Sequence, residues 1–112
     1  MQPLSAQKHD YNWVFSDRPI INMSFATPTP SIEALVDSTA WYNFVWGGSS
    51  MSDKEGNLLF FTNGYKVFDR TGKVMPNGIG LNENSYTQEW QGLNPLLQGA
   101  MIIPHPDSEG VY

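Results

Sequence analysis

The chain has 112 residues, enough for one ordinary domain, and its 13% aromatic and 15% charged residues are typical of a folded chain rather than a disordered one. Its net charge of −5 argues against nucleic acid and anionic membrane surfaces as partners. It has no cysteine, which excludes disulfides, cysteine-ligated zinc and thiol nucleophiles, and no apolar run approaches the ~20 residues that would insert into a membrane.

Turn-forming residues are frequent along the whole chain. Ten glycines and eight prolines leave little room for a long helix. A stretch without either residue, 31–46, has its aromatic and β-branched side chains concentrated in its second half, so we expect it to be mostly extended. The composition therefore predicts an all-β fold.

A meander of three or four short antiparallel strands is predicted between residues 49 and 78. Its first two strands, 49–52 and 58–62, flank a hairpin turn over 53–57 in which Gly56 takes a positive φ. The continuous apolar run 58–61 is typical of a strand that is buried on both faces.

The rest of the meander follows from its turns. Asn63-Gly64 precedes an alternating strand over 65–69, and a turn over 70–73 leads into Val74 and Met75, which the sequence Pro76-Asn77-Gly78 ends. The residues predicted to shape turns here and later in the chain are Asp53, Gly56, Asn57, Asn63, Gly64, Gly72, Gly78 and Gly110.

The C-terminal third of the sequence has fewer predicted strands. Residues 80–99 form a polar connection that carries Trp90, and connections of this length in compact domains are often functional. An apolar strand is then predicted over 100–103, followed by a turn over 104–110 that leads into Val111 and Tyr112.

The tetrapeptide pattern D-x-E-G occurs twice, at residues 53–56 and 107–110, and each copy follows a predicted strand. Repeats of ~40–50 residues with about four strands are typical of β-propeller blades. The alternative is two unrelated hairpins in a small β-sandwich. A single blade cannot bury both of its faces, and the last predicted strand is short, so we expect a partial, truncated propeller that needs further blades of a longer chain as partners.

Several segments carry more specific patterns. Residues 50–64 are similar to a hairpin of the form S-D-x-x-G-N-L-L-F-Y-T-N-G, residues 67–78 match V-x-(D/N)-R-x-x-x-x-M-P-N-G, and residues 98–106 look like Q-x-A-(I/L)-I-(I/V)-P-x-P. Together with residues 7–15, they resemble the N-terminal β-propellers of secreted proteins from Bacteroidetes-type bacteria, associated with gliding motility, type IX secretion or sensors.

The resemblance implies an organisation for the chain. Residues 1–6 would be the remnant of a signal peptide or a tag, and residues 7–112 would be the N-terminal part of the propeller. Residues 13–15 and 20–25 would complete the last blade and close the ring. The resemblance also implies export, to the extracellular space or the cell surface, and carries no catalytic motif.

Two sets of side chains are candidates for a metal site or a catalytic site. Asp53, Glu55 and Asn57 have oxygen ligands at alternating positions, as in a calcium loop, but they also suit an ordinary hairpin turn, which we favour. His9 and His105 lie too far apart in the sequence for any spacing to pair them in a metal or catalytic site. We therefore predict no metal, no cofactor and no catalytic residue.

The loop acids Glu83 and Glu89 lie near Tyr86 and Trp90, which would suit glycoside hydrolysis if a second acid faced them. Nothing in the sequence places such an acid, so a solvated loop is the preferred interpretation.

Aromatic residues near predicted loops and strand ends provide the binding hypothesis. Flat rings there can stack on sugars or anchor a protein partner, or they can fill the packing between blades. The candidates are Trp41, Trp46, Tyr86 and Trp90. The sequence thus predicts a non-enzymatic scaffold or binding module of an exported protein that recognises a surface glycan or a protein. The alternatives are an extracellular sensor domain and a carbohydrate-binding or glycan-active accessory region.

Overall fold

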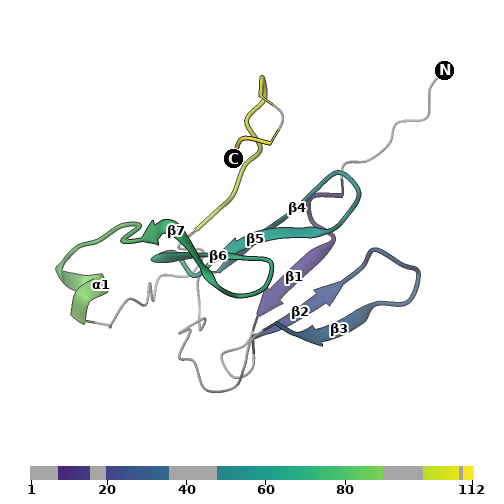
Figure 1. Cartoon of the computed structure of the whole chain (residues 1–112), viewed down its shortest axis with the longest axis horizontal. Helices are drawn as coiled ribbons and strands as arrows, with labels where there is room; N and C mark the ends of the chain where they lie inside the picture. Colours follow the sequence, from purple (N-terminus) through teal and green to yellow (C-terminus); the bar gives the residue numbers. More distant parts are fainter. Residues whose placement is uncertain (1–7, 16–19, 36–47, 90–99, 109) are drawn as a thin grey trace.

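The computed structural model describes residues 8–15, 20–35, 48–89, 100–108 and 110–112, and these ranges contain two antiparallel β-sheets and one short helix (Figure 1). The all-β class predicted from the sequence is confirmed. The N-terminal sheet has the order β1-β2-β3, and the second sheet, the meander, has the order β4-β5-β6-β7. The elements are β1 Asn12–Phe15, β2 Ile21–Ser24, β3 Ser31–Ala34, β4 Ser49–Ser52, β5 Leu58–Thr62, β6 Lys66–Asp69, β7 Val74–Ile79 and α1 Ser85–Glu89.

The N-terminal sheet has two very different faces. Asn22 of β2 lies opposite Val14 of β1 and Glu33 of β3, so these three positions share the inner face, which packs on the meander. The neighbouring positions in each strand point outward. This outer face carries only apolar side chains, namely Trp13, Phe15, Ile21, Met23, Ile32 and Ala34.

The meander confirms the strands predicted over 49–52 and 58–62. Gly56 has φ +94°, and the Asp53 N–H donates to the Asn57 carbonyl over 2.8 Å, which closes the predicted turn. The pairing between β4 and β5 shifts register between Met51 and Ser52, where a bulge accommodates the turn.

The end of the meander differs from the prediction. Pro76 does not stop the last strand, because β7 continues to Ile79. β7 is an edge strand, where the missing N–H of proline removes no ladder bond, and Asn77 takes φ 58° at an irregularity in the pairing with β6. Gly78 therefore lies within a strand rather than in a turn, and a Cβ there would lie 2.8 Å from the carbonyl oxygens of Met75 and Val67.

Two further predictions are corrected after the meander. The polar connection begins with a short helix, α1, whose first turn Asn84 caps by accepting the N–H groups of Tyr86 and Thr87 over 2.9 and 3.1 Å. Residues 100–103 do not form the predicted strand and instead line a hollow formed by side chains on one face of the meander.

The core lies between the two sheets. Ile20, Leu58, Phe61 and Phe68 are buried there, and the rings of Phe61 and Phe68 are stacked with centroids 5.1 Å apart. Val14 and Leu35 of the N-terminal segment pack on this cluster. Burial of each large apolar side chain stabilises the fold by roughly 2 kcal/mol, so this small cluster is a large part of what holds the sheets together.

The predicted burial of residues 58–61 on both faces is borne out in part. Phe61 is completely buried and Leu58 is 9% exposed, whereas Leu59 and Phe60 are half-buried. The Phe60 face of the meander is covered by residues 100–103 and Tyr112 instead of by the N-terminal sheet.

Candidate functional site

A row of buried amide side chains joins the two sheets. Asn12 donates from Nδ2 to the Ser52 hydroxyl over 2.9 Å and to the Gly56 carbonyl over 2.8 Å, which ties β1 to the first hairpin of the meander. Asn22 donates from Nδ2 to Asn12 Oδ1 over 2.9 Å and to Glu33 Oε1 over 3.2 Å. Asn12 and Asn22 are 4% and 2% exposed, so this row of hydrogen bonds lies inside the protein.

The Gly56 carbonyl determines the orientation of both amide groups in the row. The Gly56 carbonyl can only accept a hydrogen bond, so the Asn12 NH2 group must face it and the Asn12 oxygen must face Asn22. The Asn22 NH2 group then donates to that oxygen, and Asn22 Oδ1 has no hydrogen-bond partner among the described residues although it is buried. A buried carbonyl oxygen without a donor is destabilising, so a donor that reached this atom would stabilise the fold.

The amide row forms part of the wall of an open cleft between the two sheets. The cleft has a volume of about 1020 Å3. Glu33, Asp53 and Asp69 contribute carboxylates to its lining, and Arg70 contributes the one basic side chain among the described lining residues. Leu58 and Leu59 provide apolar surface on the meander side.

Two of these carboxylates also hold turns. For Asp53, burial is the largest influence and raises the pKa, but hydrogen bonds from the Asn57 side chain and from the N–H groups of Asn57, Glu55 and Gly56 outweigh it, so the pKa is lowered. For Asp69, the hydrogen bond from the Thr71 hydroxyl is the main reason that the pKa is lowered, and the Lys73 and Thr71 N–H groups and the Lys73 charge add to it against the effect of burial. Both carboxylates thus stabilise their turns in the ionised form.

A second cavity, of about 950 Å3, brings the two D-x-E-G turns together. Asp53 and Glu55 of the first turn and Asp107 and Gly110 of the second line it, so the two copies lie side by side. Gly110 has φ +76°, similar in sign to Gly56. The second turn is closed differently, since the His105 N–H donates to the Val111 carbonyl over 2.7 Å.

The same cavity is lined by both histidines, which the sequence could not pair. His9 Nδ1 lies 2.6 Å from the Ser52 carbonyl, and the Ser52 N–H donates back to the His9 carbonyl over 3.1 Å, so His9 serves to hold the segment before β1 against β4. The ring of Tyr112 meets His9 and Phe60 edge-on, with centroids 6.4 and 5.5 Å away. Within the described ranges, no group of three or more acidic or histidine side chains is placed to hold a metal ion.

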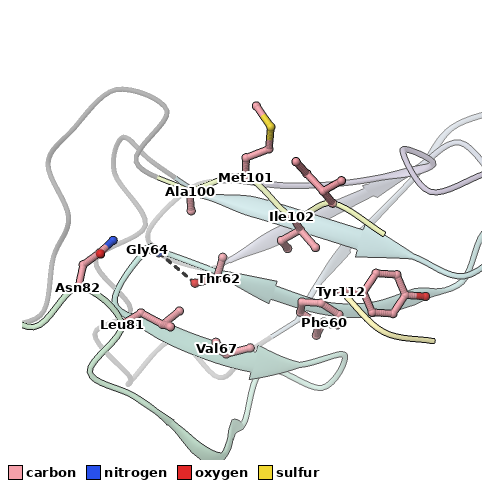
Figure 2. A pocket seen from close by; sticks show the side chains of 11 residues that line it. Phe60, Thr62, Gly64, Val67, Leu81, Asn82, Ala100, Met101, Ile102 and Tyr112 are labelled. Atoms are coloured by element: carbon pink, nitrogen blue, oxygen red, sulfur yellow. Dashed lines mark hydrogen bonds between the residues drawn. The ribbon is translucent and has the colours of Figure 1, made fainter. Parts of the chain in front are cut away.

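A third, apolar hollow of about 440 Å3 lies on the other face of the meander. Figure 2 shows Ala100, Met101 and Ile102 on one side of the hollow and Phe60, Thr62 and Val67 on the other, with Tyr112 at one end and Leu81 and Asn82 at the opposite end. The Gly64 N–H donates to the Thr62 hydroxyl over 3.0 Å at its edge. This hollow lacks ionisable side chains among its described lining residues apart from the Tyr112 phenol, so it offers packing rather than chemistry.

Three of the four aromatic binding candidates lie outside the described residues, namely Trp41, Trp46 and Trp90. Tyr86 is 47% exposed on α1 and lines none of the three cavities described above. The acids Glu83 and Glu89 are exposed on either side of it, as a solvated loop predicts.

The residues expected to shape turns mostly do so. Asp53 accepts the N–H groups of Glu55 and Asn57, and Asn63 accepts those of Tyr65 and Lys66, each through its side-chain oxygen. Positive φ angles occur at Gly56, Gly64, Gly72 and Gly110. Gly78 is the exception described above.

Asn12 and Asn22 were missed by sequence reasoning. Asn12 begins the otherwise apolar strand β1, and Asn22 stands between Ile21 and Met23 in β2. Asparagine is rare in strands, and that is the signal that could have pointed to them. The meander partners of Asn12 lie 40 and 44 positions further along the chain and could not be identified by pattern.

Comparison of the chain with protein-family models, with curated proteins and with solved structures finds no match. Within the described residues, no helix is both long enough and apolar enough to cross a membrane.

Proposed function

We propose that the two sheets are neighbouring blades of a β-propeller in an exported bacterial protein, and that this propeller is a non-enzymatic scaffold or recognition module. The observation that carries the proposal is that the meander presents apolar side chains on both of its faces and that the outer face of the N-terminal sheet is wholly apolar. Phe61 and Phe68 lie on one face of the meander and Phe60 and Val67 on the other.

This two-sided pattern separates a propeller from a sandwich. In a two-layer sandwich, each sheet has one apolar face and one solvated face, and inward and outward positions alternate accordingly. A propeller blade packs against a neighbour on each side, so both of its faces are apolar. The outer face of the N-terminal sheet fits the second arrangement, since Trp13 and Ile32 on it are 59% and 65% exposed in this chain.

The position of the repeated turns adds support. Equivalent turns of adjacent blades lie side by side around a propeller, and the two D-x-E-G turns line one cavity. The second turn and Tyr112 cover the Phe60 face of the meander, as the start of a following blade would.

Recognition rather than catalysis is favoured by how the ionisable groups are used. The carboxylates of Asp53 and Asp69 are occupied in holding turns, and His9 is bonded to the backbone of β4. These groups stabilise backbone geometry, which suits a rigid scaffold that presents a binding surface.

The absence of cysteine makes a direct test simple. A single cysteine at position 32 (Ile32→Cys) would be the only thiol in this sequence, and Glu55→Cys provides an exposed control. In the product of the complete gene, with labelling measured on the peptide that contains each position, we expect maleimide to label position 32 at least tenfold more slowly than position 55, because a neighbouring blade covers the outer face. Equal labelling rates in the native protein would refute the proposed packing.

A further inference from the structure

The cleft between the sheets contains a buried hydrogen-bond acceptor without a donor. Asn22 lies on its inner wall, is 2% exposed and has an oxygen without a partner among the described residues. The hydrogen bonds of Asn12 determine which end of the Asn22 amide is the oxygen, so the unpaired atom is an acceptor and not a donor.

Glu33 extends this acceptor surface to the mouth of the cleft. Its Oε1 lies 3.2 Å from Asn22 Nδ2, so the carboxylate is next to the amide that carries the unpaired oxygen. Glu33 itself is exposed on the edge strand β3, and a molecule that enters the cleft can therefore reach it. Asn22 at the base and Glu33 at the rim together form a short row of acceptors.

The charge of the cleft has the same sign as this acceptor surface. Glu33, Asp53 and Asp69 face it with three carboxylates, against the single guanidinium of Arg70. We propose that this cleft binds a basic group, an ammonium or a guanidinium, whose N–H donors are accepted by the Glu33 carboxylate and by Asn22 Oδ1. Such a group supplies positive charge to balance the excess of carboxylates and a donor for the unpaired oxygen.

Other occupants fit less well. A metal ion would need several ligands converging on one point, and no acidic or histidine group of that kind exists among the described residues. A neutral sugar is usually held by an aromatic platform with mixed donors and acceptors, and none of the described residues that line this cleft is aromatic.

This inference deepens the proposed function by giving the recognition module a ligand class. The cleft is nevertheless formed entirely by sheets of this chain, so its test is separate from the packing of further blades. The cleft can fail to bind a ligand while Ile32→Cys is labelled slowly as expected, and the reverse is also possible.

The test is a titration of the 15N-labelled chain followed by NMR, with the side-chain NH2 signals of Asn22 and Asn12 as reporters. The probe is the peptide acetyl-Gly-Arg-Gly-amide, and its neutral counterpart has citrulline in place of arginine. Agmatine, a small free guanidine, shows whether the basic group needs a peptide. The variant is Glu33→Gln, and Glu55→Gln is a control that removes the same charge from an exposed position outside the cleft.

We expect the arginine peptide to shift the Asn22 signals saturably, and Glu33→Gln to weaken its binding about tenfold, with Glu55→Gln unchanged. Binding of agmatine as well would support a free guanidine as the source of the ligand, and binding of the peptide alone would support a basic side chain of a partner protein. The proposal is wrong if the citrulline peptide binds equally well, if Ca2+ alone produces the same shifts, if Glu33→Gln has no effect, or if no probe shifts Asn22.

Discussion

Asn22 donates its side-chain NH2 to the side-chain oxygen of Asn12 over 2.9 Å, and neither residue is more than 4% exposed. Through Asn12, this pair connects the N-terminal sheet to Ser52 and Gly56 of the meander. The contact between the sheets thus has a polar half, formed by these amides, beside an apolar half formed around Phe61.

Removal of Asn12 tests the polar half directly. Asn12→Ala leaves the Gly56 carbonyl and the Asn22 NH2 group with fewer partners in a buried site, and we expect it to lower the free energy of unfolding by about 2 kcal/mol. Asn57→Ala is the matched control. Its side chain is exposed and bonds Asp53 at the surface, so we expect a loss of less than about 1 kcal/mol in urea unfolding followed by circular dichroism. Equal losses of unfolding free energy in the two variants would show that the buried amide row stabilises the fold no more than a surface hydrogen bond does.

The two repeated turns should differ in their tolerance of a side chain. Gly56→Ala combines a φ of +94° with a Cβ placed 3.0 Å from Tyr11 Cδ2, whereas Gly110→Ala has φ +76° and meets no atom within 4 Å. We expect unfolding free energies lower by about 2 kcal/mol for the first variant and about 1 kcal/mol for the second. A larger loss at position 110 would contradict the geometry of the turns.

Acid should remove the contribution of Asp69. Its pKa is lowered, first of all by the Thr71 hydroxyl, so it stabilises the fold above its ordinary value of 3.8 and loses that effect as the pH falls through the pKa of the folded state. Asp69→Asn should therefore be less stable than the parent at about pH 6 and should approach it at about pH 2. Urea unfolding at the two pH values measures this, and a difference that grows in acid would reverse the expected sign.

The short helix α1 should depend on its cap. Asn84 Oδ1 accepts the N–H groups of Tyr86 and Thr87, and Asn84→Ala removes both bonds at a cost of about 1 kcal/mol to the helix. We expect faster hydrogen exchange at the amides of residues 86–88. Ser85→Ala, one position further on, is the control and should leave these exchange rates nearly unchanged.

The meander could be predicted because its information is local. Asp53, Gly56 and Asn63 organise turns through contacts with residues at most four positions away, and the apolar run between them is continuous. Predictions from local sequence patterns were wrong where contacts with distant parts of the chain determine the structure. Pro76 is tolerated because β7 lies at an edge and pairs irregularly with β6, and residues 100–103 lie over side chains of the meander instead of pairing as a strand.

The site was less predictable than the strands. His9 and His105 come to one cavity because the second turn folds over the first, which no spacing rule describes. The Asn12 bonds to the meander span 40 and 44 positions. Their chemistry is visible in the sequence only as two asparagines where apolar residues would be expected.

The two faces of the N-terminal sheet have a consequence for strand register. A slip of β1 by one residue would turn Trp13 and Phe15 toward the core and Asn12 toward the outer face, and burial of apolar area within this chain alone would favour that exchange. The native register survives because only it lets Asn12 reach both Ser52 and Gly56. The hydrogen bonds of Asn12 therefore select the register of β1, although burial of the apolar side chains of the same strand would favour a different one.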